Sequence, residues 1–377
     1  PAHLRVDLKF CESGWKDELR RALRAADGLQ CPLELVLHVT ERPLDNLRNM
    51  VEALTDFGSR PFEVLVRARA IKRIIVFTSG RKTTAATESF KVAREFLREM
   101  FTPGHDLSLG GGTDADFYQL NQLRPSTDEM DFVAWSMNPQ VHAFDLASLA
   151  ETPTAIPAQI ESAKKLFRGT PLVISPVTLK PRFNAVATGP ERPVPSGELP
   201  PQVDVRQLTP FAAAWTMAVI KHLAETGAAS VTLFETTGWQ GVMERETGSP
   251  LPDKFPSQAG QVFPLFHVLG EINCFSGGEV LMTRSSDPLR VESLALTKNG
   301  WACVWLANLT GEPQTARLTG FERAAHQAEL DWLPSQEWMF VPQTGLPEKV
   351  PARVSGVKRE IELQLKPFGL VRLELEP

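Results

Sequence analysis

Four short clusters of polar residues follow apolar runs of the sequence, and together they offer carboxylates, amides, an imidazole and a guanidinium. Side chains of these types carry out general acid–base chemistry and bind oxygen-rich small molecules. No cysteine lies in the clusters, and no serine sits in the G-x-S-x-G pattern of serine esterases. The clusters are Gly110–Phe117, Asn138–Asp145, Arg182–Asn184 and Phe234–Trp239.

The acidic residue Glu235 directly follows the apolar run SVTLF. If that run is a parallel strand, the carboxylate points into the site at the end of the strand. Burying a carboxylate without partners costs several kcal/mol, so such a residue is rarely idle. We therefore expect Glu235 to act as a base or nucleophile, with pairing to a buried arginine as the structural alternative. Trp239 carries a ring that stacks well on a sugar face.

Three consecutive glycines, Gly110–Gly112, are followed at once by Thr113, Asp114 and Asp116. Glycines let the backbone approach a ligand closely, and the two carboxylates are candidates for acid–base work. We expect Asp114 to be catalytic, and Thr113 and Asp116 to bind substrate. The structural alternative is a tight turn in which Thr113 or Asp116 caps a short helix.

His142 lies beside Asn138 and Gln140 in a segment rich in hydrogen-bonding side chains. An imidazole here is suited to act as a general base or to stabilise a developing oxyanion, whereas the alternative is a histidine bonded to backbone. Arg182 and Asn184 suit a polyhydroxylated or anionic ligand. Their alternative role is to hold down the long proline-rich connection that follows.

Two weaker candidates for substrate binding lie earlier in the chain, within apolar runs. Asp7 follows the alternation of LRVDLKF towards the interior of the fold, and His38 closes the run PLELVLHV, three residues before Glu41. Asp, Glu and His are metal ligands, but no H-x-H or H-E-x-x-H spacing is present, so we expect neither a metal nor another cofactor.

Short apolar runs alternate with amphipathic stretches along most of the chain, which predicts parallel strands joined by crossover helices. The expected strands are Leu4–Phe10, Pro32–Val39, Arg73–Ser79, Leu107–Gly112, Asp131–Met137, Pro171–Val177 and Ser230–Phe234. The expected helices are Trp15–Asp27, Leu44–Phe57, Thr87–Met100, Pro157–Phe167, Leu208–Thr226 and Val262–Phe275.

A (β/α)₈ TIM barrel over residues 1–276 explains this alternation better than a doubly wound sheet. No G-x-G-x-x-G or P-loop opens a helix, and polar residues gather after the strands, as at the C-terminal face of a barrel. Only seven strands are visible, so we expect the first barrel strand to lie upstream of Pro1.

From about residue 277 the pattern changes to short alternating runs separated by turn signals, among them Lys298-Asn299-Gly300. We expect a C-terminal β-sandwich domain over residues 277–377, a common size for that architecture. Because it carries no cluster of reactive side chains, its expected role is to support the barrel.

The charge and composition of the chain argue against some classes of binding partner. The 377 residues carry a net charge of −5, with no run of like charge that favours nucleic acid and no apolar run long enough to span a membrane. The four cysteines form no C-x-x-C pair. We expect a cytoplasmic protein that binds an oxygen-rich small molecule such as a carbohydrate, and the sequence does not indicate its oligomeric state.

Long strings of this sequence resemble the D-apionate lactonase family of apiose catabolism. They are LRVDL (Leu4–Leu8), GGGTDADFYQLNQLRP (Gly110–Pro125), NPQVHAFD (Asn138–Asp145), SPVTLKPRFN (Ser175–Asn184), DVRQ (Asp204–Gln207) and ETTGW (Glu235–Trp239). The resemblance implies hydrolysis of D-apionolactone to D-apionate, and longer family members with a β region before the barrel.

The resemblance assigns no catalytic residue, so the expected roles come from chemistry. Glu235 is the first choice of base for the attacking water, and Asp114 is the second. His142, Asn138 and Gln140 would polarise the lactone carbonyl. Ring hydroxyls would be bound by Asp116, Arg182 and Asn184.

Two alternatives stay open. The chain has a more distant resemblance to retaining glycosidases with a barrel and a C-terminal sandwich, in which Glu235 would be the nucleophile and Asp114 or Asp116 the acid. Such enzymes hold their carboxyl groups about 5–5.5 Å apart, or about 6.5–9.5 Å apart when inverting. Their Asn-Glu pair is absent, because Gln140 stands where an acid is expected. The other alternative is a non-catalytic carbohydrate-binding barrel.

Overall fold

The computed structural model forms two compact units, and each is described by itself. The first unit comprises residues 1–137, 160–177 and 228–233, and the second comprises 138–159, 178–227 and 234–377. Within them, the structure describes residues 1–57, 71–79, 87–100, 107–140, 142–187, 189, 193–330 and 349–375.

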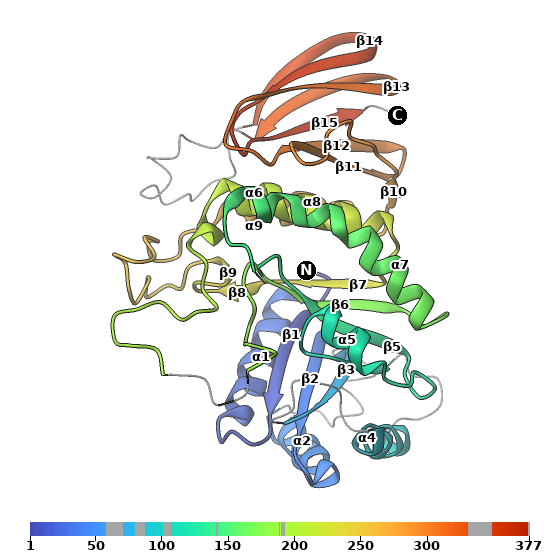
Figure 1. The fold of residues 1–377 in the computed structure, drawn as a ribbon, viewed down its shortest axis with the longest axis vertical. Coiled ribbons are helices and arrows are strands. Elements are labelled where there is room, and N and C mark those ends of the chain that lie inside the picture. Colours follow the sequence, from blue (N-terminus) through green and yellow to red (C-terminus); the bar gives the residue numbers. More distant parts are fainter. Residues whose placement is uncertain are drawn as a thin grey trace. The chain divides into compact units, whose positions relative to one another are not determined.

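A parallel sheet of seven strands forms the centre of the first unit, with the strands in chain order from β1 to β7 (Figure 1). Every neighbouring pair is parallel, which confirms the alternation predicted from the sequence. The strands are β1 (Leu4–Lys9), β2 (Leu33–Val39), β3 (Ile71–Thr78), β4 (Ser108–Gly112), β5 (Phe132–Met137), β6 (Leu172–Val177) and β7 (Ser230–Leu233).

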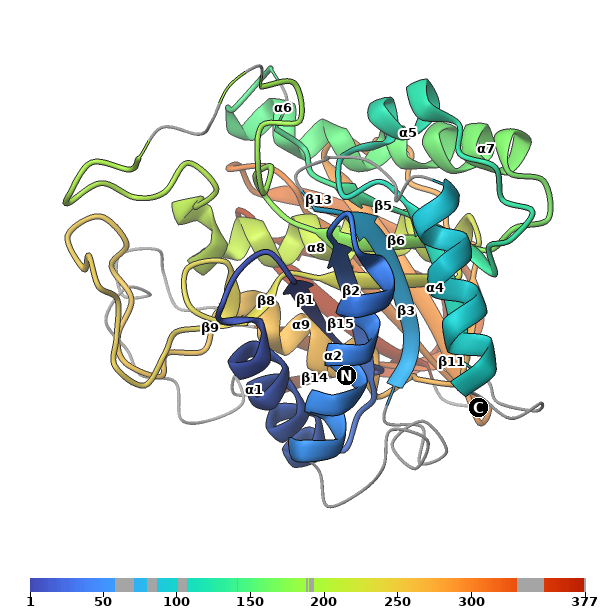
Figure 2. The ribbon, with the colours of Figure 1, turned by 90° about the horizontal axis from the view of Figure 1, so that it is seen from below.

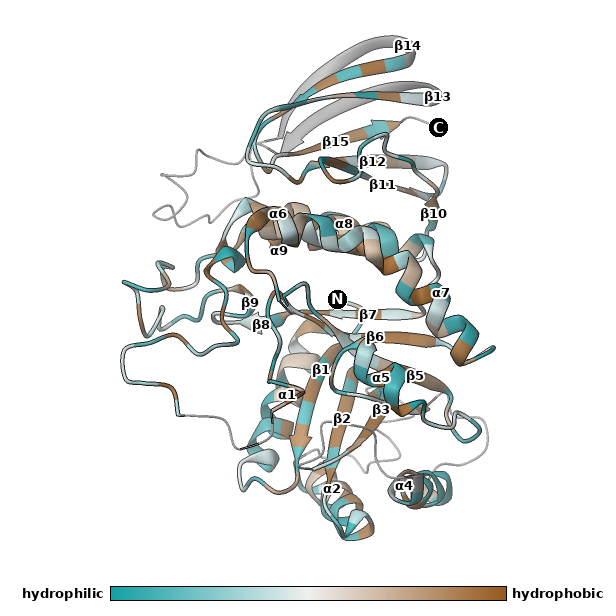
Figure 3. Ribbon diagram, viewed as in Figure 1, coloured by the Kyte–Doolittle hydropathy of each residue, from teal (hydrophilic) through white to brown (hydrophobic). Residues whose placement is uncertain are grey.

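Amphipathic helices cover the outer face of the first strands (Figure 2). These are α1 (Trp15–Leu29), α2 (Pro43–Phe57) and α4 (Thr87–Met100). Leu19, Leu47 and Phe90 of these helices join one apolar cluster with outward residues of the strands such as Leu35. Figure 3 shows the result, with largely hydrophobic strands beside helices of mixed hydropathy. Burial of these apolar stripes is what drives the helices onto the sheet.

The inner face of the sheet carries both apolar and charged side chains. Since strand side chains alternate, Leu4, Val6 and Leu8 face the helices, whereas Arg5 and Asp7 face inwards. A small inner core of Val36, Ile75, Phe77, Phe132, Ala134 and Val173 lies among the inward residues. The same alternation places Glu34 and His38 on the inner face of β2, beside Val36.

The second unit contains a six-stranded sheet in the order β10-β11-β12-β15-β13-β14. Its strands are β10 (Glu279–Leu281), β11 (Val291–Lys298), β12 (Trp301–Asn308), β13 (Gln314–Leu330), β14 (Lys349–Leu365) and β15 (Leu370–Leu375). All pairs are antiparallel, and the β13–β14 register shifts between Thr319 and Ala325. The paired ends of β13 and β14 on one side of this irregularity share one apolar core with residues of β11, β12 and β15, as in a sandwich.

The remaining elements of the second unit are mostly helical. They are α6 (Leu146–Glu151), the 3₁₀ helices Thr152–Ala155 and Val205–Leu208, α8 (Pro210–Glu225), α9 (Pro264–Asn273), and the small sheet of β8 (Glu235–Thr237) and β9 (Gly241–Met243). Two short helices lie elsewhere, α5 (Phe117–Leu123) in the first unit and α7 (Ile156–Leu166). Among the described residues, no helix combines the length and the apolar character needed to cross a bilayer.

A buried ionic cluster joins α8 to β11. Glu292 of β11 lies 3.2 Å from the Nζ of Lys221 and 3.5 Å from the Nε2 of His222, and Lys221 also pairs with Glu225 at 3.4 Å. Burial works to raise the pKa of Glu292, but the neighbouring His222 and Lys221 outweigh it and hold this pKa below its usual value. The charged form of Glu292 therefore stabilises the fold.

Replacing Glu292 with glutamine is expected to lower the free energy of unfolding by about 3 kcal/mol near pH 7, because the buried Lys221 loses a charged partner. A folded pKa below the unfolded value gives stability that is present above the unfolded pKa and is lost as the pH falls through the folded pKa. The difference between variant and wild type should therefore shrink in acid. Urea unfolding across pH measures it, with the exposed Glu279→Gln on β10 as the matched control. Equal losses in both variants would contradict this role for Glu292.

Candidate active site

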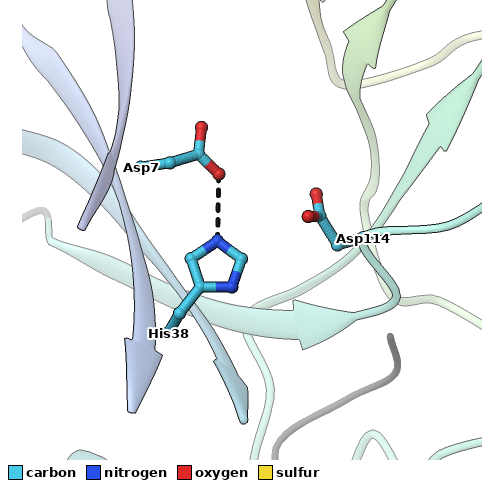
Figure 4. A group of neighbouring side chains, drawn as sticks. All are labelled: Asp7, His38 and Asp114. Atoms are coloured by element: carbon cyan, nitrogen blue, oxygen red, sulfur yellow. Dashed lines mark hydrogen bonds and ion pairs between the residues drawn. The ribbon is translucent and has the colours of Figure 1, made fainter. Parts of the chain in front are cut away.

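Side chains from β1, β2 and the end of β4 converge at one place in the first unit (Figure 4). The Nε2 of His38 lies 3.0 Å from Oδ1 of Asp7. One ligand atom each from Asp7, His38 and Asp114 lie within 4.8 Å of one another. The side chain of Asp7 is 22% exposed and that of His38 is 12% exposed, so the group is sheltered but accessible. The structure thus brings together three residues that the sequence had singled out separately.

Arg5 binds both carboxylates of this group, and all five of its N–H groups have acceptors. Its Nε and Nη2 donate to the two oxygens of Asp7 at 2.9 and 2.7 Å, and Nη2 also donates to Oδ1 of Asp114 at 2.9 Å. Nη1 donates to the carbonyl and the Oγ of Ser175, at 2.6 and 3.1 Å. Burial would lower the pKa of Arg5, but the carboxylates of Asp7 and Asp114 outweigh it and raise this pKa above its usual value.

A second polar layer lies behind Arg5 and is centred on the fully buried Glu34. Oε1 of Glu34 accepts hydrogen bonds from Ser175 and, at 3.2 Å, from Thr232. Its Oε2 lies 3.5 Å from Nε of Arg73 and 3.8 Å from Nε2 of His3. Burial lowers the pKa of His3 to about 4, so this histidine is neutral at pH 7.

The arrangement of the His38 ring favours proton transfer. Because Asp7 is an acceptor, its contact with Nε2 selects the tautomer that carries the proton on Nε2. The lone pair of the neutral ring then lies on Nδ1, which Figure 4 shows turned away from Asp7. Such a pair can take a proton from a water molecule while the carboxylate stabilises the imidazolium that forms.

The other two predicted residues of the first unit have contacts within their own loop. Thr113 is buried, and its Oγ1 accepts from the backbone of Ala115 at 3.0 Å. Asp116 caps α5, since its Oδ1 accepts from the backbone of Gln119 at 3.1 Å. The capping alternative considered for Asp116 is therefore what the structure shows, and its role towards a substrate remains a prediction.

Gln140 is the centre of a hydrogen-bonded group in the second unit. Its Nε2 donates to the carbonyl of Leu179 at 2.5 Å and to Oδ2 of Asp204 at 2.6 Å. Its Oε1 accepts from Nη2 of Arg206 at 3.2 Å, and Arg206 forms a bidentate pair with Asp204. Gln140 is almost fully buried, so these contacts tie three separated loops together.

Three other predicted residues of the second unit also have local partners. Oδ1 of Asn138 accepts from the backbone of Gln140 at 3.2 Å, and Oδ1 of Asn184 accepts from that of Val186 at 3.0 Å. The indole of Trp239 donates to Oγ of Ser249 at 2.9 Å. These contacts hold the loops in shape.

Glu235 has a different environment from the one expected. β7 ends at Leu233, Phe234 takes a left-handed φ of 57°, and Glu235 begins the separate strand β8. Its side chain is exposed, as is that of His142, and Arg182 is half-buried. The burial argument that favoured Glu235 therefore does not apply to it, and the role of these three residues stays a prediction.

Comparison with known proteins gives one family for two segments that cover most of the chain. Residues 1–277 match the family described as D-apionate lactonase, TIM barrel domain, and residues 288–373 match its C-terminal immunoglobulin-like domain. The chain belongs to the D-apionate lactonase family. These matches confirm the predicted barrel and the β-sandwich that follows it.

A curated relative supports this family. The D-apionate lactonase of Brucella anthropi is 29% identical to the chain over 216 residues. The match covers 57% of this chain and 34% of the relative, so the chain spans about a third of that protein's length.

Two solved structures show the same fold. A GH30 endoxylanase from Clostridium papyrosolvens C71 has a TM-score of 0.55 at 9% identity, over 100% of this chain and 89% of its own. A family 51 α-L-arabinofuranosidase from Bifidobacterium longum has a TM-score of 0.61 at 10% identity, over 97% and 81% of the two chains. At these identities the likeness concerns the fold alone.

Three residues of the site in this member of the D-apionate lactonase family were not predicted from the sequence. Arg5 and Glu34 are charged residues inside apolar strands, and Ser175 precedes a proline in β6. For two of them, Arg5 and Glu34, the alternation of the strands did contain an indication. Arg5 lies two positions before Asp7, and Glu34 lies four before His38, so each shares the face of a residue that had been noticed.

Proposed function

We propose that the protein hydrolyses a sugar lactone, D-apionolactone, to the open-chain acid D-apionate. The observation that carries the proposal is the His38–Asp7 pair on the inner face of the barrel, in a chain of the D-apionate lactonase family. A lactone is an ester, and its hydrolysis needs a base to activate water and a donor to protonate the leaving oxygen.

The proposed reaction uses one histidine for both proton transfers. His38 takes a proton from water through Nδ1 as the hydroxide attacks the lactone carbonyl. The tetrahedral intermediate then collapses, the bond between the carbonyl carbon and the ring oxygen breaks, and the imidazolium returns the proton to that oxygen. The product is the hydroxy acid, which ionises in water. Asp7 stabilises the charged ring between the two transfers.

The carboxylates of Asp7 and Asp114 suit the recognition of ring hydroxyls, because ionised carboxylates accept strong hydrogen bonds. Arg5 donates hydrogen bonds to both of these carboxylates. The carbonyl-polarising role expected from the sequence for Asn138, Gln140 and His142 of the second unit stays a prediction. Glu235 remains the proposed alternative to His38 as the base.

The test is to offer the purified protein a panel of γ-lactones of sugar acids and to follow acid release. We expect turnover that is fastest with D-apionolactone. Absence of hydrolysis of any lactone would refute the proposal. Release of sugar from aryl glycosides instead would place the protein among glycosidases, and saturable binding with the ligand recovered unchanged would indicate a carbohydrate-binding protein.

A further inference from the structure

Arg5 occupies the centre of the site, yet the reaction proposed above gives it no proton to transfer. We infer that Arg5 is a positioning residue, held by Ser175 and Glu34, that fixes the His38–Asp7 pair and Asp114 in their reactive arrangement. This inference rests on the proposed function, because it assigns how the same site is built.

The first argument is the number of donors. Each of the five N–H groups of Arg5 has an acceptor in the protein, two on Asp7, one on Asp114 and two on Ser175. A guanidinium has no further N–H to offer a substrate. Its planar fork instead sets the plane of the Asp7 carboxylate, and Asp7 in turn selects the tautomer of His38.

The second argument is the group behind Arg5. The Ser175 hydroxyl lies within hydrogen-bond distance of Glu34 and of Thr232, and its oxygen accepts from Nη1 of Arg5 at 3.1 Å. Glu34 is fully buried, and a buried carboxylate is costly unless it has partners. Here it orients the hydroxyl that orients Arg5.

The third argument concerns the positive charge that balances the carboxylates of Asp7 and Asp114. Asp7, His38 and Asp114 are close enough together to hold a metal ion, but Nη2 of Arg5 lies against Oδ1 of both aspartates. The guanidinium thus supplies the positive charge at this position. An ammonium would not reproduce it, because lysine has three donors on a single atom and cannot bridge two carboxylates and Ser175.

The test is chemical rescue of Arg5→Ala by guanidinium, with Arg5→Lys and Ser175→Ala as further variants. We expect lactone turnover to fall about 100-fold in Arg5→Ala and in Arg5→Lys, and about tenfold in Ser175→Ala. Millimolar guanidinium should restore turnover in Arg5→Ala with saturation, whereas ethylammonium and sodium chloride should not. Arg20→Ala, which removes an exposed arginine of α1, is the matched control and should keep full activity.

Thermal unfolding separates this inference from the proposed function. Guanidinium at the same concentrations should raise the Tm of Arg5→Ala but not that of the wild type, whether or not the protein hydrolyses lactones. Full activity in Arg5→Lys would overturn the inference, and so would a folded Arg5→Ala that guanidinium neither activates nor stabilises. Absence of lactone hydrolysis in the wild type, with this stabilisation retained, would refute the proposed function alone.

Discussion

Replacing His38 with glutamine is expected to reduce kcat for lactone hydrolysis by about 100- to 10,000-fold, the range typical of a lost general base. Glutamine can still donate an N–H to Asp7, so the carboxylate keeps a partner. It has no basic nitrogen, so it cannot take a proton from water. Because His38 also packs against Phe77, with ring centroids 5.7 Å apart, unfolding should be measured alongside kinetics.

A second variant tests the same pair without removing the ring. Asp7→Asn replaces an obligate acceptor by a side chain that also donates, so Nε2 of His38 no longer has to carry the proton. The ring then adopts the other tautomer, and we expect a loss of kcat in the same range. Wild-type kcat in Asp7→Asn would show that the pair does not transfer the proton.

Glu235→Gln distinguishes the two proposed bases. If His38 is the base, Glu235→Gln should keep kcat within a few-fold of the wild type, because its side chain is exposed on β8. A loss in Glu235→Gln as large as that expected for His38→Gln, with His38→Gln active, would reverse the assignment.

The hydropathy pattern of the sequence was sufficient to predict the architecture, because strands and helices each produce a local periodicity. All seven strands and the longer helices follow from apolar runs of period two and amphipathic stretches of period 3.6, whereas the short helices α5 and α6 were not predicted. The inward direction of Asp7 follows from the same alternation. What alternation does not give is which inward residues of different strands meet, since that depends on strand register.

Other features of the site depend on conformations that carry no local signal. Phe234 takes a left-handed φ, which is uncommon for a bulky residue, and this ends β7 before Glu235. A sequence pattern predicts a continuous strand there. Likewise, Gln140 is bound by Asp204, 64 positions away, and nothing in either segment indicates the pairing.

The glycines before Asp114 have a structural role that the sequence only partly indicated. They were expected to let the backbone approach a ligand, but they lie within β4, where the close neighbour is β5. An added Cβ on Gly112 would lie 1.9 Å from the carbonyl oxygen of Ala134, and its φ of +141° disfavours any other residue. That carbonyl also accepts from the backbone of Thr113 at 2.9 Å, so it cannot move away freely.

Gly112→Ala is therefore expected to lower the free energy of unfolding by about 4 kcal/mol or more, the range of a severe backbone clash. Any folded fraction should have lost activity, because Asp114 follows two residues later and its contact with Arg5 depends on the end of β4. Gly111→Ala is the matched control. Its new Cβ would meet the flexible methyl of Met130 at 3.0 Å, so we expect a change within about 1 kcal/mol. Urea unfolding and lactone turnover of the two variants, measured together, test whether this strand contact holds Asp114 in the site. Equal stability and activity in both would show that it does not.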